Sequence, residues 1–159
     1  MKANKGFSLI ELMIVIAIIG VVAGIAAPLF NGYRQNTNLK EAARDFSSDI
    51  ALYRQRAVAE NIRYKITFDQ PANNYTVQKE TASSSGVYID LVPAVTKSLG
   101  VYSQVIISDD PVPTVASITF SPRGTMGAGT ITLKHTTRLS TATITTNITG
   151  RVYVTYDLK

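Results

Sequence analysis

The stretch GFSLIELMIVIAIIG, residues 6–20, decides how the rest of the chain is arranged. It opens an apolar run in which residues 12–30 include no charged side chain. A helix over that run would rise about 28 Å, close to the roughly 30 Å hydrocarbon core of a bilayer. We therefore predict a membrane-spanning assembly helix over residues 7–30, behind a short basic leader over residues 1–6.

Glu11 is a carboxylate at the beginning of this apolar run. An ionisable side chain is costly in lipid unless a group of opposite charge neutralises it. Glu11 is therefore a candidate for a functional contact with a cation. The alternative is that Glu11 lies at the membrane interface and has no specific partner.

The leader determines which kind of membrane segment this is. A secretory signal has a basic start, a short apolar run and a small-residue cleavage site after that run. Here the small residue Gly6 precedes the apolar run, so cleavage after Gly6 would remove the leader and keep the helix. An uncleaved signal anchor is the alternative interpretation.

The leader and the helix resemble those of the type IV pilin and pseudopilin superfamily. The matching residues are KGFSLIEL, residues 5–12, followed by the apolar run with Gly20 and Pro28. The resemblance implies a single-pass protein of the bacterial inner membrane, with the leader in the cytoplasm and the head outside, which later joins a filament. It implies as partners the other major and minor (pseudo)pilins, the inner-membrane assembly platform and membrane lipid.

The resemblance also assigns roles to residues around the leader. It implies that prepilin peptidase cuts between Gly6 and Phe7 and then methylates the new amine of Phe7. A methylated amine stays cationic, so it can pair with Glu11 of the same or a neighbouring subunit. That pairing would select the correct stagger as a subunit leaves the membrane.

Small residues and a proline interrupt the apolar run. Gly20 and Gly24 form a G-x-x-x-G pair, which lets helices approach closely in lipid or is simply tolerated there. Pro28 removes a backbone donor and disfavours helix at Ala27. We therefore predict a kink or a locally unwound stretch between Gly20 and Pro28. In pilins that this chain resembles, the stretch loses helical order in the filament.

Beyond residue 30 the pattern becomes amphipathic, and we predict that the helix continues over residues 31–61. Apolar residues recur at spacings of three and four, which is typical of one buried helix face. The opposite face mixes acids and bases, and we expect it to be solvated. The apolar face comprises Leu39, Ala43, Phe46, Ile50, Tyr53 and Ala57. The charged face comprises Lys40, Glu41, Arg44, Asp45, Asp49, Arg54 and Arg56.

From residue 62 onward, short runs of β-branched and aromatic residues alternate with turn residues. Such spacing without intervening helices indicates an antiparallel meander. We therefore predict an α+β, pilin-like head over residues 31–159, with the long helix packed on an antiparallel β-sheet. The predicted strands cover residues 62–68, 75–79, 87–92, 101–107, 115–120, 130–135, 143–149 and 150–156.

Composition excludes some functions. The chain has no cysteine, so it has neither disulfides nor thiolate chemistry. Removing Lys2 and Lys5 with the leader leaves 14 basic against 11 acidic side chains, a formal charge of +3. That charge is too small to indicate a nucleic-acid partner by itself.

Catalysis would need a nucleophile with a base, or a metal cluster. The single histidine, His135, is in a predicted strand, where a packing or surface role is the simpler interpretation. Asp109 and Asp110 offer fewer oxygen ligands than a calcium site requires. We therefore predict a protein that is not an enzyme, binds no cofactor or metal, and is itself the substrate of a peptidase.

The second half narrows the resemblance. The sequences SITFSPRG at residues 117–124, GTITL at residues 129–133 and GRV at residues 150–152 look like the general secretion pathway protein H and FimT group of minor (pseudo)pilins. This resemblance implies a low-copy subunit near the tip of a filament. The filament is either a type II secretion pseudopilus or a type IV pilus, and the sequence leaves that choice open.

A different function is suggested by the same carboxyl-terminal residues. Some FimT-like minor pilins that bind DNA during uptake carry Gly-Arg-x-Arg here, whereas this chain has Tyr153 in place of the second arginine. Arginine can contact phosphate and tyrosine can stack on a base, although Tyr153 would serve equally well in strand packing. The candidate DNA contacts are Arg123, Arg138, Arg151 and Tyr153, with Lys134 nearby if the residues cluster.

Overall fold

The head of the molecule is the part that positions most of the candidate residues. The computed structural model describes residues 7–82, 85–102, 104–111 and 114–159. The chain divides into two compact units, with the boundary between Arg34 and Gln35. We call the second unit, Gln35–Lys159, the head.

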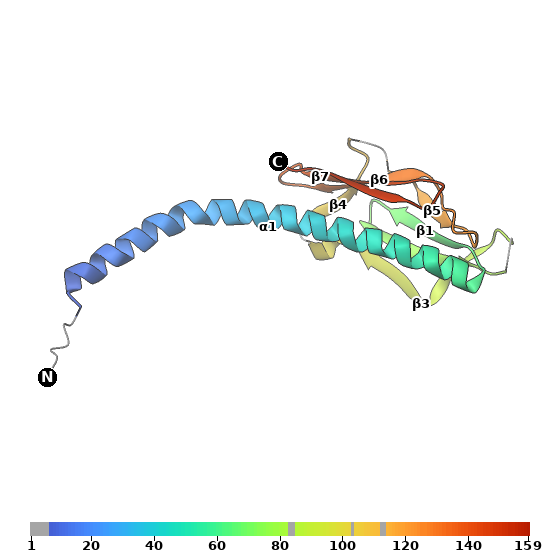
Figure 1. The fold of residues 1–159 in the computed structure, drawn as a ribbon, viewed down its shortest axis with the longest axis horizontal. Helices are drawn as coiled ribbons and strands as arrows, with labels where there is room; N and C mark the ends of the chain where they lie inside the picture. The colour runs from blue at the N-terminus through green and yellow to red at the C-terminus, as the bar shows by residue number, and fades with distance from the viewer. Residues whose placement is uncertain (1–6, 83–84, 103, 112–113) are drawn as a thin grey trace. The chain divides into compact units, whose positions relative to one another are not determined.

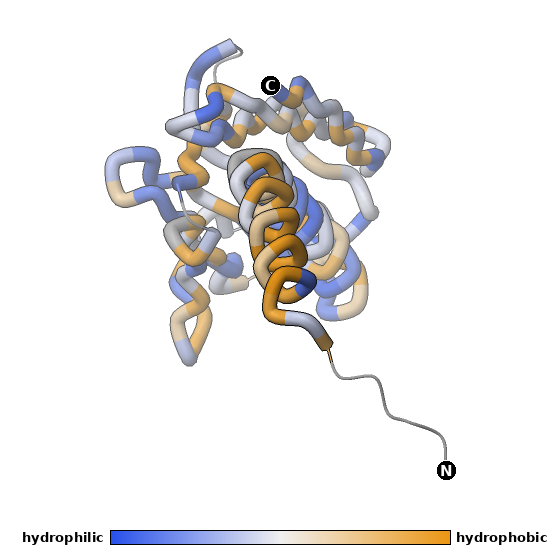
Figure 2. The backbone as a smooth tube through the Cα atoms, turned by 90° about the vertical axis from the view of Figure 1, so that its left-hand side faces the viewer, coloured by the Kyte–Doolittle hydropathy of each residue, from blue (hydrophilic) through white to orange (hydrophobic). Residues whose placement is uncertain are grey.

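The long helix α1, Leu9–Glu60, passes through both units (Figure 1). Residues 7–26 are exposed throughout, and Figure 2 shows that this part of the chain is largely hydrophobic. Within the described residues, α1 alone is long and apolar enough to cross a membrane by length and composition, and its most apolar window is not buried. An apolar surface of this size normally marks a contact with lipid or with other protein chains.

The structure does not contain the unwound stretch predicted between Gly20 and Pro28. The helix α1 is assigned without a break across these residues. A long helix can keep its backbone hydrogen bonds on both sides of a proline and lose only the bond that the proline cannot donate. Loss of helical order inside a filament stays a prediction.

The head half of α1 buries the predicted apolar face. Two residues of the predicted charged face depart from the expectation: Asp49 is only 6% exposed, and Arg54 is half-buried. Both side chains have partners on other elements, described below, which offset the cost of removing a charge from water. The buried residues of the apolar face are Leu39, Ala43, Phe46, Ile50, Tyr53 and Ala57, joined by Ala42.

The strands form two four-stranded antiparallel sheets instead of one meander. The first sheet has the order β3-β2-β1-β5, so β5 pairs with β1 and not with its neighbours in sequence. The second sheet has the order β4-β6-β7-β8. The strands of the first sheet are β1 (Tyr64–Asp69), β2 (Asn74–Glu80), β3 (Tyr88–Ser98) and β5 (Ser117–Phe120). The strands of the second are β4 (Val105–Ser108), β6 (Gly129–His135), β7 (Thr141–Thr146) and β8 (Val152–Asp157).

Three strands depart most from their predicted bounds. The strand expected to begin at residue 101 is preceded by a 3-10 helix, η1 (Leu99–Tyr102). The strand expected over residues 143–149 ends at Thr146, because the chain turns where Gly150 N–H donates to the Asn147 carbonyl. Strand β3 extends past residue 92, with a shift in its pairing to β2 between Val77 and Gln78.

Asn73 joins the two sheets. It lies in the turn between β1 and β2 with a φ of 52°, a conformation that asparagine tolerates better than most residues. Its amide group donates to the Val105 carbonyl at 2.8 Å and accepts from Ile107 N–H at 3.0 Å. The Asn73 side chain therefore forms hydrogen bonds with backbone groups of β4 and connects the first sheet to the second.

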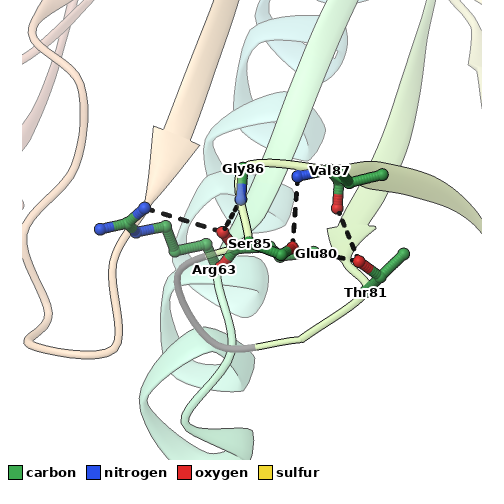
Figure 3. A network of polar contacts seen from close by, with 6 residues as sticks. All are labelled: Arg63, Glu80, Thr81, Ser85, Gly86 and Val87. Carbon is green, nitrogen blue, oxygen red and sulfur yellow. Dashed lines mark hydrogen bonds and ion pairs between the residues drawn. The ribbon is translucent and has the colours of Figure 1, made fainter.

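A buried carboxylate organises the loop between β2 and β3 (Figure 3). The Glu80 side chain is fully buried, accepts from Gly86 N–H at 2.7 Å and lies 3.7 Å from the Arg63 guanidinium. The Thr81 hydroxyl donates to the Val87 carbonyl at 3.3 Å, which closes the base of the loop. The loop lies at the end of the head where α1 stops, which we call the far end.

Candidate functional site

Phe7, which precedes α1, is exposed. Ser8 N–H donates to the Glu11 carboxylate at 3.3 Å, and Leu12 N–H donates to the Ser8 carbonyl at 3.2 Å. This is the glutamate half of a capping box, in which an acid or amide in the first turn returns to the residue before the helix. The carboxylate of Glu11 therefore lies beside the main chain one residue after Phe7, and it has a local structural role that the sequence reasoning missed.

Gly20 and Gly24 have no packing role within the described chain. A Cβ atom built at either residue would meet no atom within 4 Å. Any effect of their small size must therefore arise in contact with another helix, where small residues permit a close approach.

In the head, Arg54 of α1 contacts two glycine loops. Its Nε donates to the Gly124 carbonyl at 2.7 Å. A Cβ built at Gly150 would lie 2.6 Å from its Nη2, so the guanidinium packs directly on the Gly150 backbone. Gly124 and Gly150 have φ values of +79° and +85°, which favour glycine. We call Arg54, Gly124 and Gly150 the arginine clasp.

The arginine clasp was not predicted from the sequence. Arg54 was expected on a solvated face, whereas both glycines belong to the segments that carry the family resemblance. The two glycines were the sequence feature that could have indicated this contact. Nothing in the sequence shows, however, that one helix residue contacts both of them. The clasp fixes the two loops at the far end of the head.

The clasp brings together some of the candidate DNA contacts and separates others. Arg123 and Arg151 precede and follow the clasp glycines, and both are exposed. Arg138 lies in the turn after β6, at the opposite end of the sheet. Strands β6 and β7 pair from Gly129 with Thr146 to Lys134 with Thr141, a span of roughly 17 Å. The sequence left open whether these residues cluster, and in the structure Arg138 lies apart from Arg123 and Arg151.

The remaining candidates near this sheet have separate environments. Tyr153 is 51% exposed on β8, opposite Thr145. Lys134 pairs with Asp110, at the end of the sheet away from the clasp. An exposed tyrosine is available for stacking, but it has no second arginine beside it in the sequence.

His135 is a packing residue. It is 1% exposed, and its Nδ1 accepts from Thr137 N–H at 3.3 Å. Burial lowers the pKa of His135, and the nearby charge of Arg138 lowers it further. The neutral ring therefore holds the turn between β6 and β7.

The carboxylate of Asp109 has a structural role, because it accepts hydrogen bonds from neighbouring loops. It accepts from Thr114 N–H and from the Gln70 amide, each at 2.8 Å, and the first of these bonds is the main cause of its lowered pKa. Within the described residues no three histidine, cysteine or acidic side chains lie close enough to hold a metal ion.

The arginine clasp makes a prediction about stability. Gly150→Ala should lower the free energy of unfolding by about 2–3 kcal/mol, because alanine is strained at positive φ and its methyl group displaces Arg54 from Gly124. Gly86→Ala is the matched control, since Gly86 also has positive φ but a Cβ there meets nothing within 4 Å. We expect it to cost about 1 kcal/mol. Denaturant unfolding of the full chain in detergent measures both, and equal losses would contradict the clasp.

Two family models match this chain, one at its amino-terminal end and one over most of the head. Residues 1–27 match the model of the prokaryotic N-terminal methylation motif. Residues 42–150, more than half of the chain, match the model described as type II transport protein GspH.

Individual relatives agree with these matches. A fimbrial protein of Pseudomonas aeruginosa is 52% identical over 48 residues, which are 30% of this chain and 31% of that protein. The type IV major pilin protein PilA of Myxococcus xanthus (strain DK1622) is 32% identical over 144 residues, covering 80% of this chain and 63% of the pilin. The chain therefore spans less than two thirds of the length of either relative.

Solved structures show the same fold. The minor pseudopilin EpsH from the type 2 secretion system of Vibrio cholerae has a TM-score of 0.58 at 12% identity, covering 75% of this chain and 97% of that chain. The type IV minor pilin FimU of Pseudomonas aeruginosa (strain PAO1) has a TM-score of 0.55 at 14% identity, covering 77% and 92%. With its methylation motif, its apolar helix and its two-sheet head, the chain belongs to the GspH family within the pilin superfamily.

Proposed function

We propose that the chain is a minor (pseudo)pilin, a structural subunit near the tip of a type II secretion pseudopilus or a type IV pilus. The observation that carries the proposal is the helix α1. It begins within a prepilin motif, exposes an apolar surface over its amino-terminal part and continues into the folded head. An apolar surface of this kind needs lipid before assembly and neighbouring helices after it. The subunit supports filament initiation and protein secretion by moving from the lipid bilayer into the filament, where neighbouring helices cover its apolar surface.

Maturation prepares this transfer. In this proposal, prepilin peptidase cuts the chain between Gly6 and Phe7. The same enzyme then methylates the new amine of Phe7. Before cutting, the chain spans the inner membrane once, with the leader in the cytoplasm and the head outside. The chain is a substrate of this enzyme and has no catalytic function of its own. Its partners are the assembly platform and the other major and minor subunits.

A filament fraction tests the proposal. We expect the full chain, carrying an epitope tag at its carboxyl end, to appear in sheared filaments at low abundance. Labelling with an antibody against the tag should mark filament ends. If the tagged chain stays in the membrane fraction while the major subunit is sheared off normally, the proposal is wrong.

DNA binding is the second candidate function. The observation that favours it is that the arginine clasp holds the loops of Arg123 and Arg151 at the same end of the head. Phosphate contacts by such arginines are weakened by salt. If the second candidate is correct, a gel shift of the purified full chain should show salt-sensitive binding that Arg151→Ala weakens. Arg138→Ala, at the opposite end of the sheet, should leave the binding unchanged.

A further inference from the structure

A groove in the head lies between α1 and the segment formed by the end of β3 and η1. Its volume is about 410 Å³, within the range of about 300–1,000 Å³ that is typical of ligand clefts. Ala42, Phe46 and Leu99 contribute apolar lining, and Asp45 and Tyr102 contribute polar lining. We call it the η1 groove.

The charge around the η1 groove is negative. Asp45 is exposed and accepts a hydrogen bond from the Tyr102 hydroxyl through its Oδ2 atom. Within the described part of the chain, the Oδ1 atom of Asp45 has no hydrogen-bond donor. A carboxylate can accept two parallel bonds from a guanidinium, so Asp45 keeps capacity for a cation.

The other charged groups near the groove leave this negative charge uncompensated. Lys97 lines the groove, but its ammonium is 2.7 Å from the carboxylate of Asp49. Burial, the bond to Asp45 and the negative charges of Asp45, Glu41 and Asp49 together raise the pKa of Tyr102 to about 12. Asp45 and Lys97 line the groove, whereas Glu41 and Asp49 lie near Tyr102 but outside the lining, and Asp49 is the carboxylate that pairs with the ammonium.

The apolar lining complements that charge. Lys and Arg place their aliphatic stems along apolar surface while the charged end contacts a carboxylate. The rim of the groove includes Val101, which is 81% exposed. A groove with an acid at its side and apolar residues along its length therefore suits a basic side chain that has an apolar neighbour, and it repels phosphate.

We propose that the η1 groove receives a lysine or arginine side chain of a neighbouring pilin subunit, with its charged end on Asp45. The inference rests on the proposed function, because the pilin family associates with other pilins. The groove lies beside α1, the helix through which the subunits assemble. Contact at Asp45 would orient the head after the apolar helices have met.

Cross-linking in cells tests the inference on the full chain. A photoreactive amino acid replaces Val101, and mass spectrometry identifies the adduct. We expect an adduct with another filament subunit, next to a lysine or arginine of that subunit. The same substitution at Val92, which is 95% exposed and outside the groove, is the positional control and should give no such adduct.

Charge variants show whether Asp45 is responsible. Asp45→Asn keeps the shape and the bond from Tyr102, and it should lower the adduct yield by about tenfold; Asp45→Arg should abolish the adduct. Asp90→Asn is the matched control, because Asp90 is also exposed and accepts one bond, from Gln78 at 3.0 Å. It should leave the yield unchanged.

Several results would overturn the inference. They are an adduct with lipid or with a protein that is not a pilin, no adduct at Val101, or a yield that Asp45→Arg does not change. The amount of unmodified chain in sheared filaments separates this failure from failure of the proposed function. If the chain is absent from filaments, both are wrong; if it is present and the adduct is missing, only the groove contact is wrong.

Discussion

Phe46→Asp is expected to unfold the head. Phe46 is 2% exposed, and its ring centroid lies 5.0 Å from Tyr75 and 5.5 Å from Phe68. The substitution removes edge-to-face contacts with both rings and places a carboxylate among apolar side chains. Such a change costs more than about 4 kcal/mol, a large part of the stability of a single domain. We therefore expect no cooperative unfolding transition in the variant.

Leu52→Asp is the matched control for Phe46→Asp. Leu52 lies on the same helix and is 40% exposed, so the new carboxylate can remain in water. The control should change the free energy of unfolding by less than about 1 kcal/mol. Near-ultraviolet circular dichroism and denaturant unfolding of the full chain in detergent measure both variants. A Phe46→Asp protein that unfolds at the same denaturant concentration as the control would show that α1 does not anchor the core.

Glu11→Gln is expected to reduce incorporation into filaments by at least about tenfold. Truncating one member of a buried, hydrogen-bonded charge pair costs about 2–5 kcal/mol, and the proposed pair between Glu11 and the amine of Phe7 would lie in a low-dielectric setting. Glutamine nearly keeps the size of the side chain. It can also take the capping position, which accepts either residue. Insertion, cleavage and folding should therefore stay normal.

The capping bond from Ser8 gives this experiment its control. Glu11→Ala removes both the charge and the cap, whereas Glu11→Gln removes the charge alone. The abundance of each variant in sheared filaments is compared with its abundance in membranes. If Glu11→Gln assembles like the parent protein and Glu11→Ala does not, Glu11 acts as a helix cap and the charge-pairing mechanism is wrong.

The sequence by itself determined the features that depend on local pattern. Residues 6–20 indicated the prepilin motif, and the spacing of apolar residues after residue 30 predicted which face of α1 is buried. A helix face is fixed by its own periodicity, so neighbouring elements are not needed to identify it. Most of the strands were located for the same reason, since an alternating run favours a strand whatever its partner.

Only the tertiary structure decided which strands pair. Backbone hydrogen bonds are the same for every sequence, so the pairing of β5 with β1 depends on packing and chain connection, not on a local signal. The division into two sheets follows from that pairing. The separation of Arg138 from Arg151 follows from the pairing of β6 with β7 and of β7 with β8, because consecutive antiparallel turns lie at opposite ends of a sheet.

The tertiary structure also decided which charged side chains are buried. Asp49 and Arg54 have the sequence pattern of a solvated face, yet Asp49 accepts from the Tyr75 hydroxyl at 2.5 Å and Arg54 donates to Gly124. A charge can leave water only where distant residues supply opposite charge or hydrogen bonds. The sequence contains these partners 26 and 70 residues away, and folding alone brings them to the helix.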